Sequence, residues 1–213
     1  MLKRVVGSLL LSTLACGMLA AQNSGPKVAH TVRQSAVTPA RETPATLQTI
    51  YTNFGPTTTD YYNDTTGYYV LGPDNSVSDP EQGIGLPFTP KADAHVTQLQ
   101  AAIGSISGTS VVEIGLYSDA SGTPGTLLAS GRSTKIPDFG ACCTVVSVTI
   151  ASTAVTAGTQ YWIVASSDNT HAPDFTGVWQ ASNLSNIAGN ESQSGWFTFS
   201  ANVPAGAAKG TVP

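Results

Sequence analysis

Two adjacent cysteines, Cys142 and Cys143, carry the most distinctive chemistry in this 213-residue chain. The only other cysteine, Cys16, lies in a segment that we expect to be removed on export. In an oxidising compartment a bond between the two thiols is favoured, although it closes almost no loop of chain. We expect a vicinal disulfide that shapes its loop. Free or interchain thiols, and a redox or ligand-binding role, stay open as alternatives.

An acidic stretch offers hard oxygen ligands for a metal ion. Its candidate ligands are Asp74, Asn75, Asp79 and Glu81. Calcium takes six to eight oxygens from carboxylates, amides and carbonyls. The stretch lacks the spacing of an EF-hand, and acidic turns also arise from turn chemistry alone. Ca²⁺ binding here is therefore one hypothesis beside an ordinary turn, and no other cofactor is expected.

Paired aromatic residues could hold a sugar. Adjacent rings in an extended chain point to opposite faces of a sheet, so one ring of each pair should face outward. The candidates for stacking on a ligand are Tyr62, Tyr69, Trp179 and Trp196. The alternative is that half of the rings belong to the core and the others cover strand edges.

Motifs for catalysis are missing from the sequence. His95 and His171 are the only histidines after residue 46. There is no Gly-x-Ser-x-Gly nucleophile motif and no pair of zinc-binding histidines on a helix. We expect no catalytic residue, and a hydrolase with an unrecognised site is the alternative. For a hydrolase, a pocket would have to join one histidine to a carboxylate and a serine.

The N-terminus predicts export. Lys3 and Arg4 precede an apolar run over 5–15, and small residues follow over 17–21. This order is typical of a cleaved signal peptide over 1–21, with the cut somewhere in 17–21. Secretion to the periplasm or the medium is expected, and a lipid on Cys16 is the less favoured alternative. The proline-bearing stretch 22–46 shows no apolar period and predicts a flexible linker.

Short apolar runs separated by turn residues begin at Leu47 and indicate one domain over 47–213. Several runs alternate with period two, and no sustained helical period is present. The pattern predicts an all-β, antiparallel two-sheet β-sandwich of jelly-roll-like form, with the last ten or so residues as a frayed tail. The expected strands are 47–53, 67–71, 84–88, 95–104, 110–118, 126–135, 144–150, 159–166, 176–181 and 195–200.

The set of motifs along these strands resembles the choice-of-anchor R domain, an exported bacterial domain expected to be a β-sandwich. The matching motifs are Asn53-Phe54-Gly55-Pro56, Gly72-Pro73-Asp74, Pro87-Phe88-Thr89-Pro90, Leu116-Tyr117-Ser118-Asp119, Gly122-Thr123-Pro124-Gly125, Phe139-Gly140-Ala141-Cys142-Cys143 and Ala157-Gly158-Thr159-Gln160-Tyr161-Trp162. The resemblance covers about 47–200 and implies a surface-associated protein. It carries over no activity and no functional residue. Members of such families commonly end in a surface-anchoring tail, and residues up to Pro213 show no such hydrophobic tail, which puts anchoring by the C-terminus in doubt.

Composition narrows the function further. Only 10% of residues are charged and the net charge is −4, which argues against a nucleic-acid-binding protein. No stretch after the leader is long and apolar enough to span a membrane. The leading hypothesis is a non-enzymatic, surface-associated binding or adhesion module, with a glycan or matrix polymer as the first partner to test. A structural envelope or matrix protein without a small ligand is the alternative.

Overall fold

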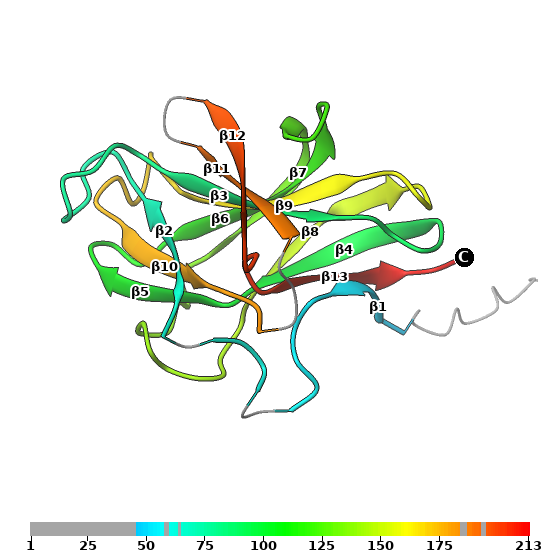
Figure 1. Cartoon of the computed structure of the whole chain (residues 1–213), viewed down its shortest axis with the longest axis horizontal. Coiled ribbons are helices and arrows are strands. Elements are labelled where there is room, and N and C mark those ends of the chain that lie inside the picture. The colour runs from blue at the N-terminus through cyan, green and yellow to red at the C-terminus, as the bar shows by residue number, and fades with distance from the viewer. Residues whose placement is uncertain (1–45, 58–59, 64, 184–186, 193–194) are drawn as a thin grey trace, which may run out of the picture. The chain divides into compact units, whose positions relative to one another are not determined.

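The computed structural model describes residues 46–57, 60–63, 65–183, 187–192 and 195–213. These described residues all belong to one compact unit, which is drawn in Figure 1. The predicted leader over 1–21 and all but the last residue of the predicted linker over 22–46 lie outside the described residues.

All regular structure in the described ranges is β-strand, which confirms the predicted all-β class. Alternating apolar and polar residues explain most of these strands, since one face of each is buried. No helix in these ranges has the length and apolar character needed to cross a bilayer. The strands are β1 Gln48–Thr52, β2 Gly67–Leu71, β3 Gly83–Phe88, β4 Ala94–Ala101, β5 Ile103–Ser107, β6 Val112–Asp119, β7 Pro124–Ser133, β8 Val146–Val155, β9 Tyr161–Ser167, β10 Thr176–Gln180, β11 Ile187–Ser192, β12 Trp196–Ala201 and β13 Gly206–Thr211.

The strands form three antiparallel sheets. Their orders are β12-β11-β3-β9-β6-β7, β1-β13-β4-β8 and β2-β10-β5. The two smaller sheets meet at Ala102, between β4 and β5, where Ala102 N donates to Ala205 O and Gln180 N donates to Ala102 O. Figure 1 shows β4 and β5 following one another along the same side of the domain. The predicted antiparallel sandwich is thus confirmed, with one layer divided into two sheets.

A single main core joins all three sheets. Ile114, Leu116 and Ile163 of the six-stranded sheet share it with Leu99 of β4 and Trp179 of β10. Each of these side chains is fully buried. Burying a large apolar side chain stabilises a protein by roughly 1.5–3 kcal/mol, so this shared core holds the sheets together.

The predicted frayed tail is wrong. Residues Gly206–Thr211 form β13, which lies between β1 and β4 in the four-stranded sheet. Ala207 and Ala208 are fully buried there. A Cβ atom added to Gly210 would lie 1.8 Å from His95 O, so close approach of the neighbouring backbone selects small residues in this strand.

The outer face of the six-stranded sheet carries a row of apolar side chains. Pro87 on β3 pairs with Trp162 on β9, Trp162 pairs with Tyr117 on β6, and Tyr117 pairs with Leu127 on β7. Leu86 and Ile163, next to them along their strands, point the other way into the core. Pro87 and Trp162 of this row form the floor of the site described next.

Candidate functional site

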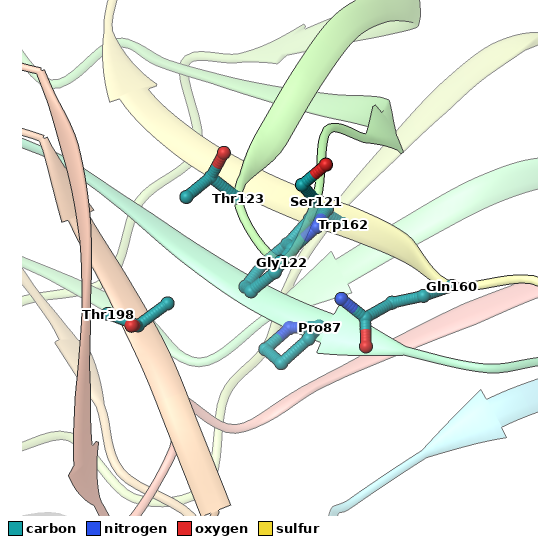
Figure 2. A pocket seen from close by; sticks show the side chains of 7 residues that line it. All are labelled: Pro87, Ser121, Gly122, Thr123, Gln160, Trp162 and Thr198. Carbon is teal, nitrogen blue, oxygen red and sulfur yellow. The ribbon is translucent and has the colours of Figure 1, made fainter.

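A hollow of about 460 Å³ opens on this outer face. Strands β3 and β9 supply its floor, the loop between β6 and β7 supplies one wall, and β12 supplies another (Figure 2). Its volume falls within the ~300–1,000 Å³ typical of small-molecule sites. Its described lining residues are Pro87, Ser121, Gly122, Thr123, Gln160, Trp162 and Thr198.

The β6–β7 loop is fixed by its own hydrogen bonds. Ala120 N donates to Thr123 O at 2.7 Å, and Gly122 N donates to Asp119 Oδ2 at 3.1 Å. Ser121 and Gly122 both have positive φ angles, 59° and 89°, a conformation that glycine adopts without strain. The wall that this loop gives to the hollow is therefore formed before any ligand binds.

Asp119 orients two residues that line the hollow. Its Oδ1 accepts a hydrogen bond from Trp162 Nε1 at 2.8 Å and another from Gln160 Nε2 at 2.7 Å. Burial acts to raise the pKa of Asp119, but the hydrogen bonds from Trp162, Gly122 and Gln160 outweigh it, so the pKa lies below its usual range. Asp119 is therefore ionised at neutral pH and holds the indole and the amide in place.

The surface of the hollow is uncharged. None of its described lining residues carries a charge, and several offer a hydroxyl or an amide. Only 1% of Trp162 is exposed, so its ring contributes a floor rather than an open stacking platform. An ion entering this space would lose hydration without a compensating partner, and the nearby Asp119 carboxylate disfavours anions. The chemistry of the site suits a neutral, hydroxyl-rich ligand.

A smaller hollow of about 170 Å³ adjoins the first one. The two share Pro87 and Gln160, and the smaller is also lined by Tyr51, Phe88 and Thr89. The rings of Tyr51 and Phe88 lie 5.3 Å apart, measured between centroids. Burial raises the pKa of Tyr51 to about 12, so its hydroxyl stays protonated and neutral.

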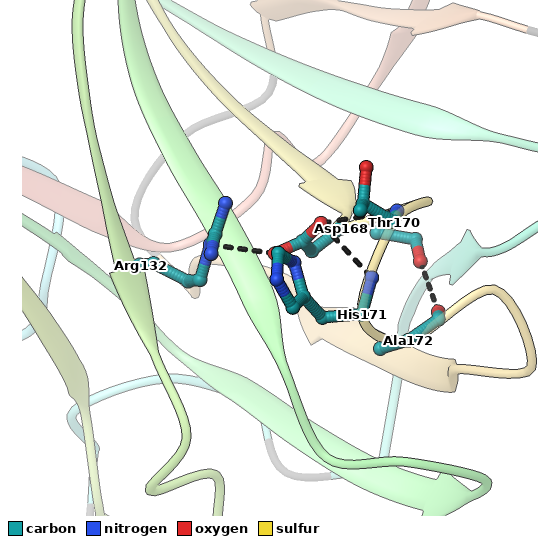
Figure 3. Close-up of polar contacts among 6 residues, drawn as sticks. Arg132, Asp168, Thr170, His171 and Ala172 are labelled. Atoms are coloured by element: carbon teal, nitrogen blue, oxygen red, sulfur yellow. Dashed lines mark hydrogen bonds and ion pairs between the residues drawn. The ribbon is translucent and has the colours of Figure 1, made fainter.

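A second carboxylate, Asp168, forms a polar cluster on the loop after β9. Its Oδ2 lies 2.6 Å from Arg132 Nε of β7 and 2.9 Å from His171 Nδ1 (Figure 3). Its Oδ1 accepts the backbone N–H of Thr170 at 3.1 Å. Burial acts to raise the pKa of Asp168, but the hydrogen bonds from His171 and Thr170 and the charge of Arg132 lower it overall. The cluster ties the β9–β10 loop to the edge strand β7.

The Asp168–His171 pair has two of the parts that the hydrolase alternative needs. A serine nucleophile would have to lie within hydrogen-bond reach of the imidazole. Ser167, next in sequence, instead donates its hydroxyl to Ala172 O at 2.6 Å. His171 is also absent from the described lining of the two hollows. The pair is explained by its role in shaping the loop.

The four predicted stacking aromatics do not form one site. Tyr62 and Trp179 are 2% and 0% exposed, and these two predictions are wrong because each ring packs inside and uses its polar atom internally. Tyr62 Oη donates to Ala141 O, and Trp179 Nε1 donates to Ala205 O. Tyr69 is exposed but lies on β2, in another sheet. Trp196 of β12 is half-buried, and its ring lies 4.0 Å from where a Cβ of Gly83 would stand.

In the acidic loop predicted to bind calcium, the Asn75 side-chain amide hydrogen-bonds to the loop's own backbone. Asn75 Nδ2 donates to Gly72 O and to Asp79 O, both at 2.7 Å. Glu81 accepts a hydrogen bond from Asn169. Within the ranges that the structure describes, Asp74, Asp79 and Glu81 do not form a group suited to hold a metal ion. Calcium binding by this loop stays a prediction.

Cys142 and Cys143 are joined as a vicinal disulfide. The pair lies beside a small second core that contains Phe54 and Tyr62, against which Cys143 packs. The Tyr62 hydroxyl contacts Ala141 O at 3.0 Å and Thr144 O at 3.2 Å, one on each side of the pair. These contacts fix the loop before β8, as expected for a structural bond.

No protein-family model matches the chain, and no curated protein matches its sequence. The resemblance to the choice-of-anchor R domain therefore stays a prediction from sequence motifs.

Sequence reasoning missed the residues that build the hollow, although it found their elements. The expected strands over 110–118, 126–135 and 159–166 correspond to β6, β7 and β9, which carry or flank most of these residues. Asp119 and Trp162 are separated by 43 residues along the chain. A motif of one acidic residue with a distant tryptophan has no sequence signature, so only the folded chain reveals it.

Proposed function

We propose that this protein is a secreted, non-enzymatic β-sandwich that binds a neutral glycan in the hollow of the six-stranded sheet. The observation that carries the proposal is the pair of hydrogen bonds by which Asp119 fixes Trp162 and Gln160 in an uncharged hollow. Export rests on the predicted leader, and the surface-associated role rests on the family resemblance.

The chemistry of a sugar matches the lining of this site. A sugar ring has an apolar face of C–H groups, which packs on an apolar surface. Its rim of hydroxyls needs several hydrogen-bonding groups. Pro87 supplies most of the surface and Trp162 only the small part of its ring that is exposed, while Gln160, Thr123 and Thr198 supply polar groups. Since Gln160 Nε2 donates to Asp119, its Oε1 is the amide atom that can accept from a ligand hydroxyl.

A glycan array probed with the full chain, with and without Ca²⁺, tests this proposal. We expect neutral glycans to bind and acidic glycans, such as sulfated or uronate polymers, to bind less well. Thr198→Arg would fill the hollow and should abolish binding. Thr149→Arg is the matched control, because Thr149 is an exposed strand residue on β8 of another sheet. Equal binding by both variants, or no binding to any neutral glycan, would refute the site.

A structural role without a small ligand is the second candidate. The observation that favours it is the polar outer surface of the four-stranded sheet, where Ser147 and Thr149 of β8 are exposed. Gln100 Nε2 of β4 donates to Ser147 Oγ across this face at 2.9 Å. Concentration-dependent assembly of the purified protein, in the absence of glycan binding, would favour this candidate.

A further inference from the structure

The two adjoining hollows differ in volume, and the smaller one would lengthen the space open to a ligand. The larger, at about 460 Å³, can hold a small-molecule ligand, whereas the smaller, at about 170 Å³, lies below the usual range for an independent site. Both are lined by Pro87 and Gln160. The smaller hollow is therefore an extension of the larger one, with these two residues at the junction.

We infer that the two hollows are consecutive subsites for neighbouring units of a linear neutral glycan, an inference that rests on the glycan-binding function proposed above. The larger hollow takes one sugar unit between the β6–β7 loop and β12. The smaller takes the next unit against Tyr51 and Phe88, with Thr89 at its side. Gln160 lies between the two units, and its carbonyl accepts a hydroxyl near the linkage.

The lining of the smaller hollow supports a sugar unit there. The Tyr51 ring, which packs on the buried Phe88 ring with 5.3 Å between the centroids, gives an apolar surface. The neutral Tyr51 hydroxyl and the Thr89 hydroxyl give hydrogen-bonding groups. Like the larger hollow, it has no charged residue in its described lining. A chain that continues from one hollow into the other thus meets the same kind of surface twice, and an acidic polymer is disfavoured in both.

Binding measured against ligand length tests this inference. The probes are cello-, laminari-, malto- and chito-oligosaccharides of one to six units, titrated calorimetrically into the full chain. In the series that binds, we expect the two-unit ligand to bind at least tenfold more tightly than the one-unit ligand, and longer ligands to add less. Thr89→Arg should bring the affinity for two units down to that for one unit, whereas Thr149→Arg should leave the affinity for both lengths unchanged.

The outcomes separate the inference from the proposed function. Equal affinity for one and two units in the unaltered protein, or an unchanged length dependence in Thr89→Arg, overturns the paired subsites while glycan binding stands. No binding at any length in any series overturns both. A gain from one to two units that disappears in Thr89→Arg and persists in Thr149→Arg supports the inference.

Discussion

Asp119 and Asp168 are two carboxylates of the same sheet that have different structural roles. Each lies at or just after the C-terminal end of a strand of the six-stranded sheet, and each has a pKa below its usual range. Asp119 accepts hydrogen bonds from the neutral donors Trp162 and Gln160, which line a hollow. Asp168 contacts Arg132 and His171, which are absent from the described lining of both hollows.

The difference shows that a low pKa alone does not mark a binding site. Perturbed titration accompanies functional sites and structural clusters alike. What distinguishes the two is the kind of partner and the space beside it. Neutral donors held next to an uncharged hollow can recognise a neutral ligand, whereas Arg132 and His171, which meet a single carboxylate, fasten a loop.

Replacing each carboxylate by alanine should have the largest effects, and it should distinguish the ligand-binding role of Asp119 from the loop-fastening role of Asp168. Asp119→Ala leaves the buried Trp162 N–H without its acceptor, which should lower the free energy of unfolding by about 1–3 kcal/mol. Glycan affinity should fall at least tenfold, because Gln160 and Trp162 lose their orientation. Asp168→Ala should also lower thermal stability but leave glycan affinity unchanged. Calorimetric titration and urea unfolding of both variants check this, and equal losses of affinity would remove the distinction.

The vicinal disulfide gives a test of stability away from both carboxylates. Closing so short a loop changes chain entropy little, so replacing Cys142 and Cys143 by serine should cost about 1–2 kcal/mol, near the average of point mutations. Glycan affinity should not change, since neither residue is among the described lining of the hollows. Urea unfolding gives the stability, and maleimide should label the unaltered protein only after reduction. Ready labelling of the oxidised protein would contradict the bond.

Substitution of two buried tryptophans by phenylalanine gives a matched pair of variants, and each should lower stability less than the changes above. Trp162→Phe and Trp179→Phe each shorten a buried ring and remove one N–H hydrogen bond, of 2.8 Å in both cases. The lost bond alone should cost about 0.5–1.5 kcal/mol in each. Only Trp162→Phe should weaken glycan binding, by several-fold. If Trp179→Phe weakened it equally, the effect would be a general one on the fold.

The sequence predicts most of the strands but not the residues that build the site. Alternation in β6 and β8 predicts their buried faces, because Val112, Ile114 and Leu116 recur with period two and so do Val146, Val148 and Ile150. Strand β13 was missed, since its small residues carry no apolar alternation and only the neighbouring strands require them. The hollow was missed for a similar reason, because it depends on contacts between distant segments.

Lowering the pH should have the smallest effect on stability, and it should act in the same direction through both carboxylates. Both have folded pKa values below the ordinary 3.8, so each contributes stability that is present above about pH 4 and is lost as the pH falls through the folded pKa. The stability gap between the unaltered protein and Asp119→Asn should therefore be constant from pH 5 to 7. The gaps for Asp119→Asn and for Asp168→Asn should both narrow below pH 4. Thermal melts from pH 2.5 to 7 check this. A gap that widens on acidification would contradict the direction of both shifts.

The indole N–H signals of the protein's three tryptophans provide the most direct test of the glycan site. Trp162, Trp179 and Trp196 give one resonance each in a ¹⁵N-labelled sample, and Trp→Phe variants assign them. Titration with the tightest-binding oligosaccharide of the length series should shift the Trp162 signal strongly and leave the buried Trp179 signal in place. A titration that saturates the protein without moving Trp162, or that moves Trp179 in its stead, would contradict a site built on Asp119, Gln160 and Trp162.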